Sequence, residues 1–168
     1  ELKPRVFIYD DDHYYLGGAL AEYCVQQGKS VCLVTPDSLV SSWTVNTLEQ
    51  EKIQSRLSKL GVEMITLHGL QQVDKESAII SSVYDSEKTQ TIAFDSLITI
   101  TSRSPRNDLY HQLLEYDENF KTLLAIGDCD APSTVAAAVY AGHLAARNLQ
   151  SQADFYTPLF RREMPELD

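Results

Sequence analysis

The amino-acid sequence predicts an α/β fold with a parallel sheet and a small antiparallel meander, and three observations support this prediction. Residues 5–35 show apolar and helical patterns in the order strand, helix, strand. Residues 123–149 show a strand, turn and helix pattern that passes through Gly127. Between them, residues 62–94 form short apolar runs separated by polar turns, which is typical of an antiparallel meander.

The chain opens with an apolar strand, Arg5–Tyr9, that ends at Asp10–Asp12. Helical spacing follows over residues 16–27 and stops at Gly28, and residues 31–35 form a second buried strand. Strand, helix and strand within about 30 residues make a βαβ unit, and its parallel crossover is right-handed in nearly all proteins. We therefore expect a Rossmann-like, three-layer domain around a parallel sheet.

The chain continues with a loop over residues 37–46 and an amphipathic helix over residues 48–60 that stops at Gly61. The loop contains Trp43, the single tryptophan of the sequence. Two interpretations of Trp43 stay open, a buried anchor for the loop and an exposed interface residue.

The predicted meander has three strands and one hairpin tip. The strands cover residues 62–68, 78–85 and 89–94, and the tip is Ser86–Lys88. The elements expected after it are a buried strand over residues 97–101, a helix over 107–116 and a strand over 122–126. A last helix follows, opened by Pro132 or Ser133.

Composition limits the classes of partner. A formal net charge of -10 over 168 residues argues against nucleic acid and anionic membranes, because both favour clustered Lys and Arg. No run approaches the roughly 20 apolar residues of a membrane helix. Glu1 opens the chain without an initiator Met or a signal-peptide pattern. We expect a cytoplasmic protein of which this chain is a piece, and we leave open whether it forms a homo-oligomer.

Cysteine and histidine residues show no metal-ligand spacing, so we predict no metal site. Cys24 and Cys32 occupy apolar positions and are expected to be core thiols. The other residues considered are scattered and are expected to be ordinary side chains: Cys129, His68, His111 and His143.

The turn at Asp10–Asp12 lacks the glycines of a dinucleotide fingerprint. Acidic side chains at the first two glycine positions repel a pyrophosphate and fill its space, so NAD(P) binding is disfavoured there. Two other interpretations are an Mg²⁺-binding receiver domain and a dehalogenase-like nucleophile at Asp10 paired with Asp12. A receiver domain needs a phosphoacceptor aspartate at the end of a third strand, and this chain has none around Ser55, where a helix is expected. We favour an acidic, solvated turn without a ligand.

The turn at Gly127–Asp128 suits anion and sugar binding. Gly127 permits a close approach to the backbone, and Asp128 can accept hydrogen bonds from hydroxyl groups. The following helix directs free N–H groups and a positive dipole end toward a phosphate. The alternative is a plain strand-to-helix turn of an α/β domain.

The segment Ile126–Pro132, IGDCDAP, together with AGHLAA at residues 141–146, resembles the second flavin-binding segment of flavoproteins with two dinucleotide domains. The sequence ITSR, which ends at Arg103, resembles the strand and turn before it, with Ser102 in place of a glycine. In order and spacing, nearly the whole chain is similar to the C-terminal part of the trimethylamine dehydrogenase and histamine dehydrogenase group. Relatives of this group include 2,4-dienoyl-CoA reductase and other NADH:flavin oxidoreductases.

This resemblance implies a domain plan related to glutathione-reductase-type FAD and NAD(P) domains. Residues 1–95 would be an NAD(P)-type subdomain with a degenerate glycine motif. Residues 96–149 would be the C-terminal half of an FAD- or ADP-type domain, and residues 150–168 an irregular tail. The implied contacts to ADP or FAD are Gly127, Asp128, Ala131, Pro132, Thr101 and Arg103.

The same resemblance implies a larger enzyme. Its FMN and [4Fe-4S] cluster would lie in an N-terminal barrel of the same polypeptide, and an electron-transfer flavoprotein would accept the electrons. This chain would hold no catalytic residue and would be inactive alone. The acidic turn favours the amine dehydrogenase branch, in which NAD(P) supplies no electrons. Two alternatives stay open, a fragment of a 2,4-dienoyl-CoA reductase-like NAD(P)H:flavin oxidoreductase and a non-catalytic Rossmann-like interaction domain.

Overall fold

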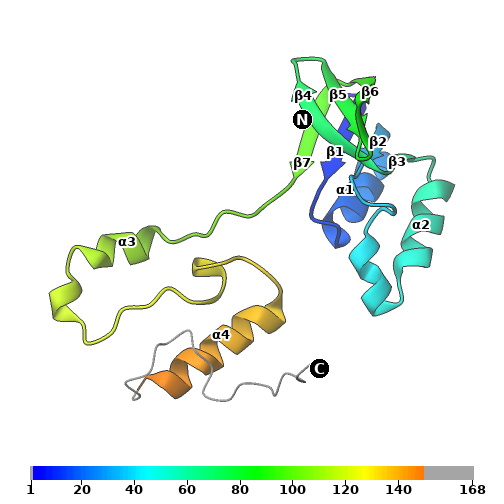
Figure 1. The fold of residues 1–168 in the computed structure, drawn as a ribbon. Coiled ribbons are helices and arrows are strands. Elements are labelled where there is room, and N and C mark those ends of the chain that lie inside the picture. The colour runs from blue at the N-terminus through cyan, green and yellow to red at the C-terminus, as the bar shows by residue number, and fades with distance from the viewer. Residues whose placement is uncertain (1, 150–168) are drawn as a thin grey trace, which may run out of the picture. The chain divides into compact units, whose positions relative to one another are not determined.

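The main sheet contains four parallel strands, seen in a computed structural model that describes residues 2–149 (Figure 1). The strands are β1 (Arg5–Asp10), β2 (Ser30–Val34), β3 (Glu63–Ile65) and β7 (Ser96–Ile100), in the order β3-β2-β1-β7. In the register of β1, Ile8 pairs with Leu33 on one side and with Ile98 on the other. The predicted α/β class and parallel sheet are confirmed.

The two faces of this sheet are covered by different layers, because side chains alternate along β1. Val6 and Ile8 pack in a core with residues of α1 (Tyr15–Gln26) and α2 (Gln50–Lys59). Phe7 and Tyr9 pack in a second core with the antiparallel meander. Burying a side chain as completely as Ile8 contributes about 1.5–3 kcal/mol to stability. The predicted three-layer arrangement with a meander is thereby confirmed.

The meander consists of β4 (His68–Val73), β5 (Ser77–Ser82) and β6 (Asp85–Ala93) in sequential order. The predicted hairpin tip at Ser86–Lys88 is wrong, because these residues lie within β6 and the turn is at Val83–Tyr84. Residues 86–91 of β6 are exposed. Their polarity reflects a solvent-facing edge strand, which a sequence pattern does not distinguish from a turn.

The predicted strand over residues 62–68 is also wrong as a single element of the meander. Its first part is β3, which pairs in parallel with β2 in the main sheet. The backbone turns at Leu67, whose φ is 57°, and β4 then starts in the other sheet. The predicted loop over residues 37–46 contains a 3-10 helix, η1 (Ser42–Thr47).

The chain divides into two compact units, and β7 belongs to the first, which ends at Ser102. The second begins at Arg103 and contains α3 (Asp108–Leu114), η2 (Asp117–Asn119), η3 (Gly127–Cys129) and α4 (Val135–Asn148). The proposed division into nucleotide-binding halves, 1–95 and 96–149, stays a prediction. The predicted tail, 150–168, lies outside the described residues.

The predicted strand over residues 122–126 is not a strand in the structure. Ile126 has extended dihedral angles, φ −140° and ψ 156°. Extended backbone becomes a strand only when a neighbouring strand completes its hydrogen bonds. Within residues 103–149 the structure assigns no strand that could do so.

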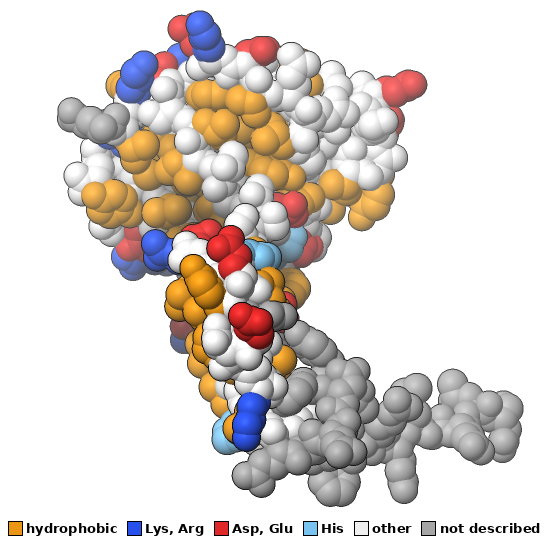
Figure 2. Space-filling view, turned by 90° about the vertical axis from the view of Figure 1, so that its left-hand side faces the viewer, with side chains coloured by type: hydrophobic (Ala, Val, Ile, Leu, Met, Phe, Trp, Pro, Cys, Tyr) orange, Lys and Arg blue, Asp and Glu red, His pale blue; other side chains and the backbone are white. Residues whose placement is uncertain are grey.

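The second unit buries little of its apolar surface within residues 103–149. No residue of α3 is buried, and Asn148 is the only buried residue of α4. Val135 and Tyr140 of α4 are 82% and 59% exposed. Figure 2 shows hydrophobic side chains open to solvent on this unit. Among the helices described, none is long and apolar enough to span a membrane.

Candidate functional site

The Gly127–Asp128 turn forms the start of η3. Gly127 has φ 61°, a left-handed conformation that favours glycine. Its carbonyl oxygen accepts hydrogen bonds from the backbone N–H groups of Asp130, at 3.0 Å, and Ala131, at 2.9 Å. Asp128 is exposed, and its Oδ1 accepts from the Ser133 N–H at 3.3 Å. The turn therefore places an exposed carboxylate just ahead of α4.

The N-terminus of α4 is capped by Thr134. The Thr134 hydroxyl accepts from the Ala137 N–H at 3.3 Å, which satisfies one of the free N–H groups of the first turn. The prediction that Pro132 or Ser133 opens the helix is therefore wrong by one or two residues. Pro132 lies half-buried in the connection, where Ser133 instead donates to Asp128.

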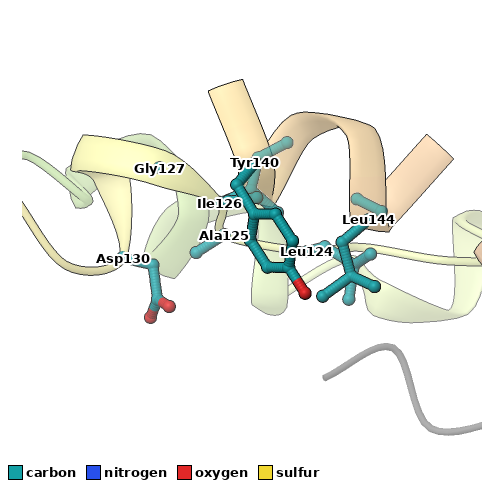
Figure 3. A pocket seen from close by; sticks show the side chains of 9 residues that line it. Leu124, Ala125, Ile126, Gly127, Asp130, Tyr140 and Leu144 are labelled. Carbon is teal, nitrogen blue, oxygen red and sulfur yellow. The ribbon is translucent and has the colours of Figure 1, made fainter. Parts of the chain in front are cut away.

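An apolar cavity of about 160 Å³ lies between residues 124–127 and α4. Gly127 lines it, and Asp130 is the one charged residue among those that do. Figure 3 shows the side chains of Tyr140 and Leu144 that project from α4 at this cavity. Asp128 does not line it. Such a cavity suits an apolar group and not a phosphate.

The other residues named from the sequence lie on both sides of the boundary between the units. Thr101 follows β7 in the first unit and is exposed. Arg103 is the first residue of the second unit and is also exposed. Ala131 lies with Pro132 between η3 and α4. The contact of these residues with a nucleotide stays a prediction.

The carboxyl ends of the parallel strands form the second place where a ligand would be expected in this fold. Asp10 ends β1 there, and its side chain is completely buried. Asp10 Oδ1 accepts from the Asp12 N–H at 3.1 Å, whereas Oδ2 has no partner within residues 2–149. Burial raises the pKa of Asp10, and hydrogen bonds from backbone N–H groups of Asp12 and His13 oppose this shift.

The prediction of a solvated turn is therefore wrong for Asp10. It fits Asp11, which is exposed and whose Oδ1 lies 3.3 Å from His13 Nε2. In the described range no three His, Cys, Asp or Glu side chains come together as metal ligands. Asp10 is buried because it ends β1 next to the glycine-containing start of α1. Asp11 lies beyond the end of the strand and is exposed.

Residues at this edge of the sheet form hydrogen bonds with one another. His13 Nδ1 lies 3.4 Å from Thr35 Oγ1, and the His13 carbonyl oxygen accepts from the Trp43 N–H at 3.0 Å. His13 itself has φ 61°, which is rare for a residue other than glycine. The turn after β1, the exit of β2 and the start of η1 are thus held together. Trp43 is 56% exposed, which excludes a buried anchor.

Asp37, after β2, occupies the region where dinucleotide folds place an acidic residue for a ribose. Its Oδ2 accepts from the Ser42 hydroxyl at 2.5 Å, and its Oδ1 accepts from the Ser38 N–H at 2.6 Å. The hydroxyl of Ser42 is the main cause of a lowered pKa for Asp37. The carboxylate is therefore engaged within the chain.

The sequence did not identify Gly17, His13 and Thr35 as residues that form contacts at the carboxyl ends of the parallel strands. The pair Gly17–Gly18 was visible as the one glycine pair of the sequence. A glycine pair at the start of a helix that faces a strand end is a signal of close packing. The contacts of His13 and Thr35 join residues 22 positions apart and leave no local pattern.

Comparison with known proteins identifies the family of the chain and several relatives. A family model described as OYE-like second alpha/beta domain matches residues 1–123. Dimethylamine dehydrogenase from Hyphomicrobium sp. (strain x) is 24% identical over 181 aligned residues, which cover 95% of this chain and 24% of that protein.

Solved structures give a similar result. Histamine dehydrogenase from Rhizobium sp. 4-9 matches with a TM-score of 0.87 and 36% identity over 99% of this chain and 26% of its own. The 6-hydroxypseudooxynicotine amine oxidase HisD from Pseudomonas geniculata N1 matches with a TM-score of 0.76 and 28% identity, over 83% of this chain and 21% of its own. The chain thus spans about a quarter of the length of these relatives. It belongs to the family of OYE-like second alpha/beta domains and is related to the dimethylamine and histamine dehydrogenases, as its sequence predicted.

Proposed function

We propose that this chain is the nucleotide-binding and structural region of an amine-oxidising dehydrogenase. In this proposal the Gly127–Asp128 turn of the second unit contacts ADP or FAD, whereas the first unit binds no dinucleotide. The contrast between the two turns carries the proposal. Asp128 presents an exposed carboxylate ahead of a helix N-terminus, whereas Asp10 is buried within its own turn.

The residues of the second turn fit the polar part of a nucleotide. Asp128 can accept from ribose hydroxyl groups while its Oδ1 keeps the Ser133 N–H. The absence of a side chain at Gly127 and the short one at Ala131 leave the backbone accessible there. Arg103, also in the second unit, would contribute positive charge for a phosphate.

Similarity over nearly the whole chain to amine dehydrogenases supports the rest of the proposal. By that resemblance, an N-terminal barrel of the same polypeptide would carry FMN and a [4Fe-4S] cluster. The bound FMN would supply the oxidation chemistry, a demethylation or deamination of an amine. The electrons would pass to an electron-transfer flavoprotein in the cytoplasm, and this chain alone would be inactive.

The test is nucleotide binding by the full-length protein. Asp128→Ala should weaken binding of ADP or FAD at least about tenfold in a calorimetric titration, because a charge-assisted hydrogen bond contributes roughly 1.5–3 kcal/mol. Asp74→Asn removes a carboxylate from an exposed turn of the first unit and should change nothing. Equal binding by the wild type and Asp128→Ala would contradict the proposal.

Two alternatives predict other outcomes of the same titration. A 2,4-dienoyl-CoA reductase-like NAD(P)H:flavin oxidoreductase would bind NADH or NADPH at the first unit of the wild type. A non-catalytic interaction domain would bind none of the nucleotides. The buried Asp10 at the pyrophosphate position disfavours the first of these alternatives.

A further inference from the structure

The start of α1 lies unusually close to the end of β1. A methyl group added to Gly17 would stand 2.0 Å from Asp10 Oδ2 and 2.5 Å from Asp10 Cγ. Such distances are far inside van der Waals contact. The first turn of α1 can therefore hold the Asp10 carboxyl group only because residue 17 has no side chain.

The Asp10 carboxyl group is also unusual in its own surroundings. It is completely buried, and Oδ2 has no hydrogen-bond partner within residues 2–149. A buried carboxyl oxygen without a hydrogen-bond partner costs stability, so its presence in a fold calls for an explanation. Here that oxygen faces Gly17, in the first turn of α1.

This position has a known use in dinucleotide folds. The glycine-rich turn after the first strand leaves room for a pyrophosphate, which binds at the N-terminus of the following helix. We propose that the Asp10 carboxyl group occupies the phosphate subsite of the first unit from within, and that Gly17 is required to admit it. This inference rests on the proposed function, in which the first unit binds no dinucleotide.

Neighbouring contacts hold Asp10 in that position. The Asp12 N–H donates to Oδ1 at 3.1 Å, and the Trp43 N–H fixes the carbonyl oxygen of His13 in the same turn. To rotate out to solvent, the carboxyl group would have to give up its hydrogen bond with the Asp12 N–H. In this proposal the chain itself fills the subsite, and no ligand is needed to close it.

A double-mutant cycle in the full-length protein tests the contact between Asp10 and Gly17. Gly17→Ala alone should lower the Tm by about 5 °C or more, because the added methyl group overlaps a buried carboxyl group. In the Asp10→Gly background the same substitution should cost much less, or raise the Tm, because alanine favours a helix. Gly142→Ala, at a helix position where an added methyl group meets nothing within 4 Å, should have the same effect in both backgrounds.

Inorganic pyrophosphate then tests whether the space is a phosphate subsite. Millimolar pyrophosphate should raise the Tm of Asp10→Gly by a few degrees more than it raises the Tm of the wild type or of the control Asp11→Gly, because only Asp10→Gly opens a second phosphate site and a ligand stabilises the protein that binds it. If Asp10→Gly does not fold, Asp10→Ser replaces it, since serine keeps an acceptor for the Asp12 N–H. If Gly17→Ala alone does not fold, a double variant Gly17→Ala/Asp10→Gly that does fold would also support the contact.

Two results would overturn the inference. One is a cost of Gly17→Ala that does not depend on residue 10, and the other is an Asp10 variant that pyrophosphate stabilises no more than it stabilises the wild type. Titration of the wild type with NADH separates this failure from that of the proposed function. Binding of NADH at the first unit would contradict both proposals, whereas ADP binding that depends on Asp128, with no coupling in the cycle, would contradict this inference alone.

Discussion

Asp10 gives the sharpest expectation for a single side chain, because it is a buried carboxyl group with a raised pKa. The folded protein therefore binds a proton at Asp10 more tightly than the unfolded chain does, and the ionised form costs stability at neutral pH. We predict that the stability of the wild type relative to Asp10→Asn rises as the pH falls from 7 toward 4. Urea unfolding at several pH values measures this difference. A difference that shrinks on acidification would show that the fold holds the ionised form.

Asp95 should respond to pH in the opposite direction. Arg5 donates from Nε to Oδ2 at 3.0 Å and from a terminal nitrogen to Oδ1 at 2.7 Å, and this pair lowers the pKa of Asp95 to about 2. The stability from the pair is present above the unfolded pKa of about 3.9 and is lost as the pH falls toward 2. Asp95→Asn should therefore flatten the acid limb of the unfolding curve. A variant whose acid limb matches that of the wild type would contradict this account.

At two helices, replacing a glycine by alanine should change the free energy of unfolding in opposite directions. Gly28 follows α1 at φ 73°, and a methyl group there meets nothing within 4 Å, so Gly28→Ala is penalised only by its backbone conformation. We expect a loss of about 1 kcal/mol, measured by urea unfolding. Gly142 lies within α4 in equally open space, so Gly142→Ala should stabilise its helix by roughly 0.5–1 kcal/mol. Two changes of the same sign would show that packing, and not backbone conformation, determines both effects.

Elements with strong periodicity were predictable, and those set by pairing were not. The βαβ unit at residues 5–35 and the stop at Gly28 follow from local patterns. The three residues of β3 carry the same apolar pattern whichever sheet they join, so their parallel pairing with β2 was not visible. Residues 122–126 have the composition of a strand but lie in a unit whose described residues supply no strand partner.

The candidate site was predictable to the same degree. The sequence placed Gly127 and Asp128 at a turn before a helix, and the structure has such a turn, with the helix cap moved to Thr134. It also located the acidic turn but not the burial of Asp10, because burial depends on how closely α1 approaches β1 at Gly17. Contacts between distant residues, such as His13 with Thr35, arise only in the folded chain.

At the scale of the whole molecule, we propose that two roles are divided between the two units. The first unit has two well-packed cores and a strand edge closed by its own side chains. The second unit has an exposed turn beside an apolar cavity and few buried side chains among residues 103–149. We therefore predict that a nucleotide protects backbone amides of the second unit and leaves those of the first unchanged.

Hydrogen exchange of the full-length protein, with and without ADP, FAD or NADH, tests this division most directly. We predict that ADP or FAD slows amide exchange over residues 127–137 and that NADH changes nothing over residues 10–18. Slower exchange of residues 10–18 with NADH, or no nucleotide effect at residues 127–137, would contradict the account.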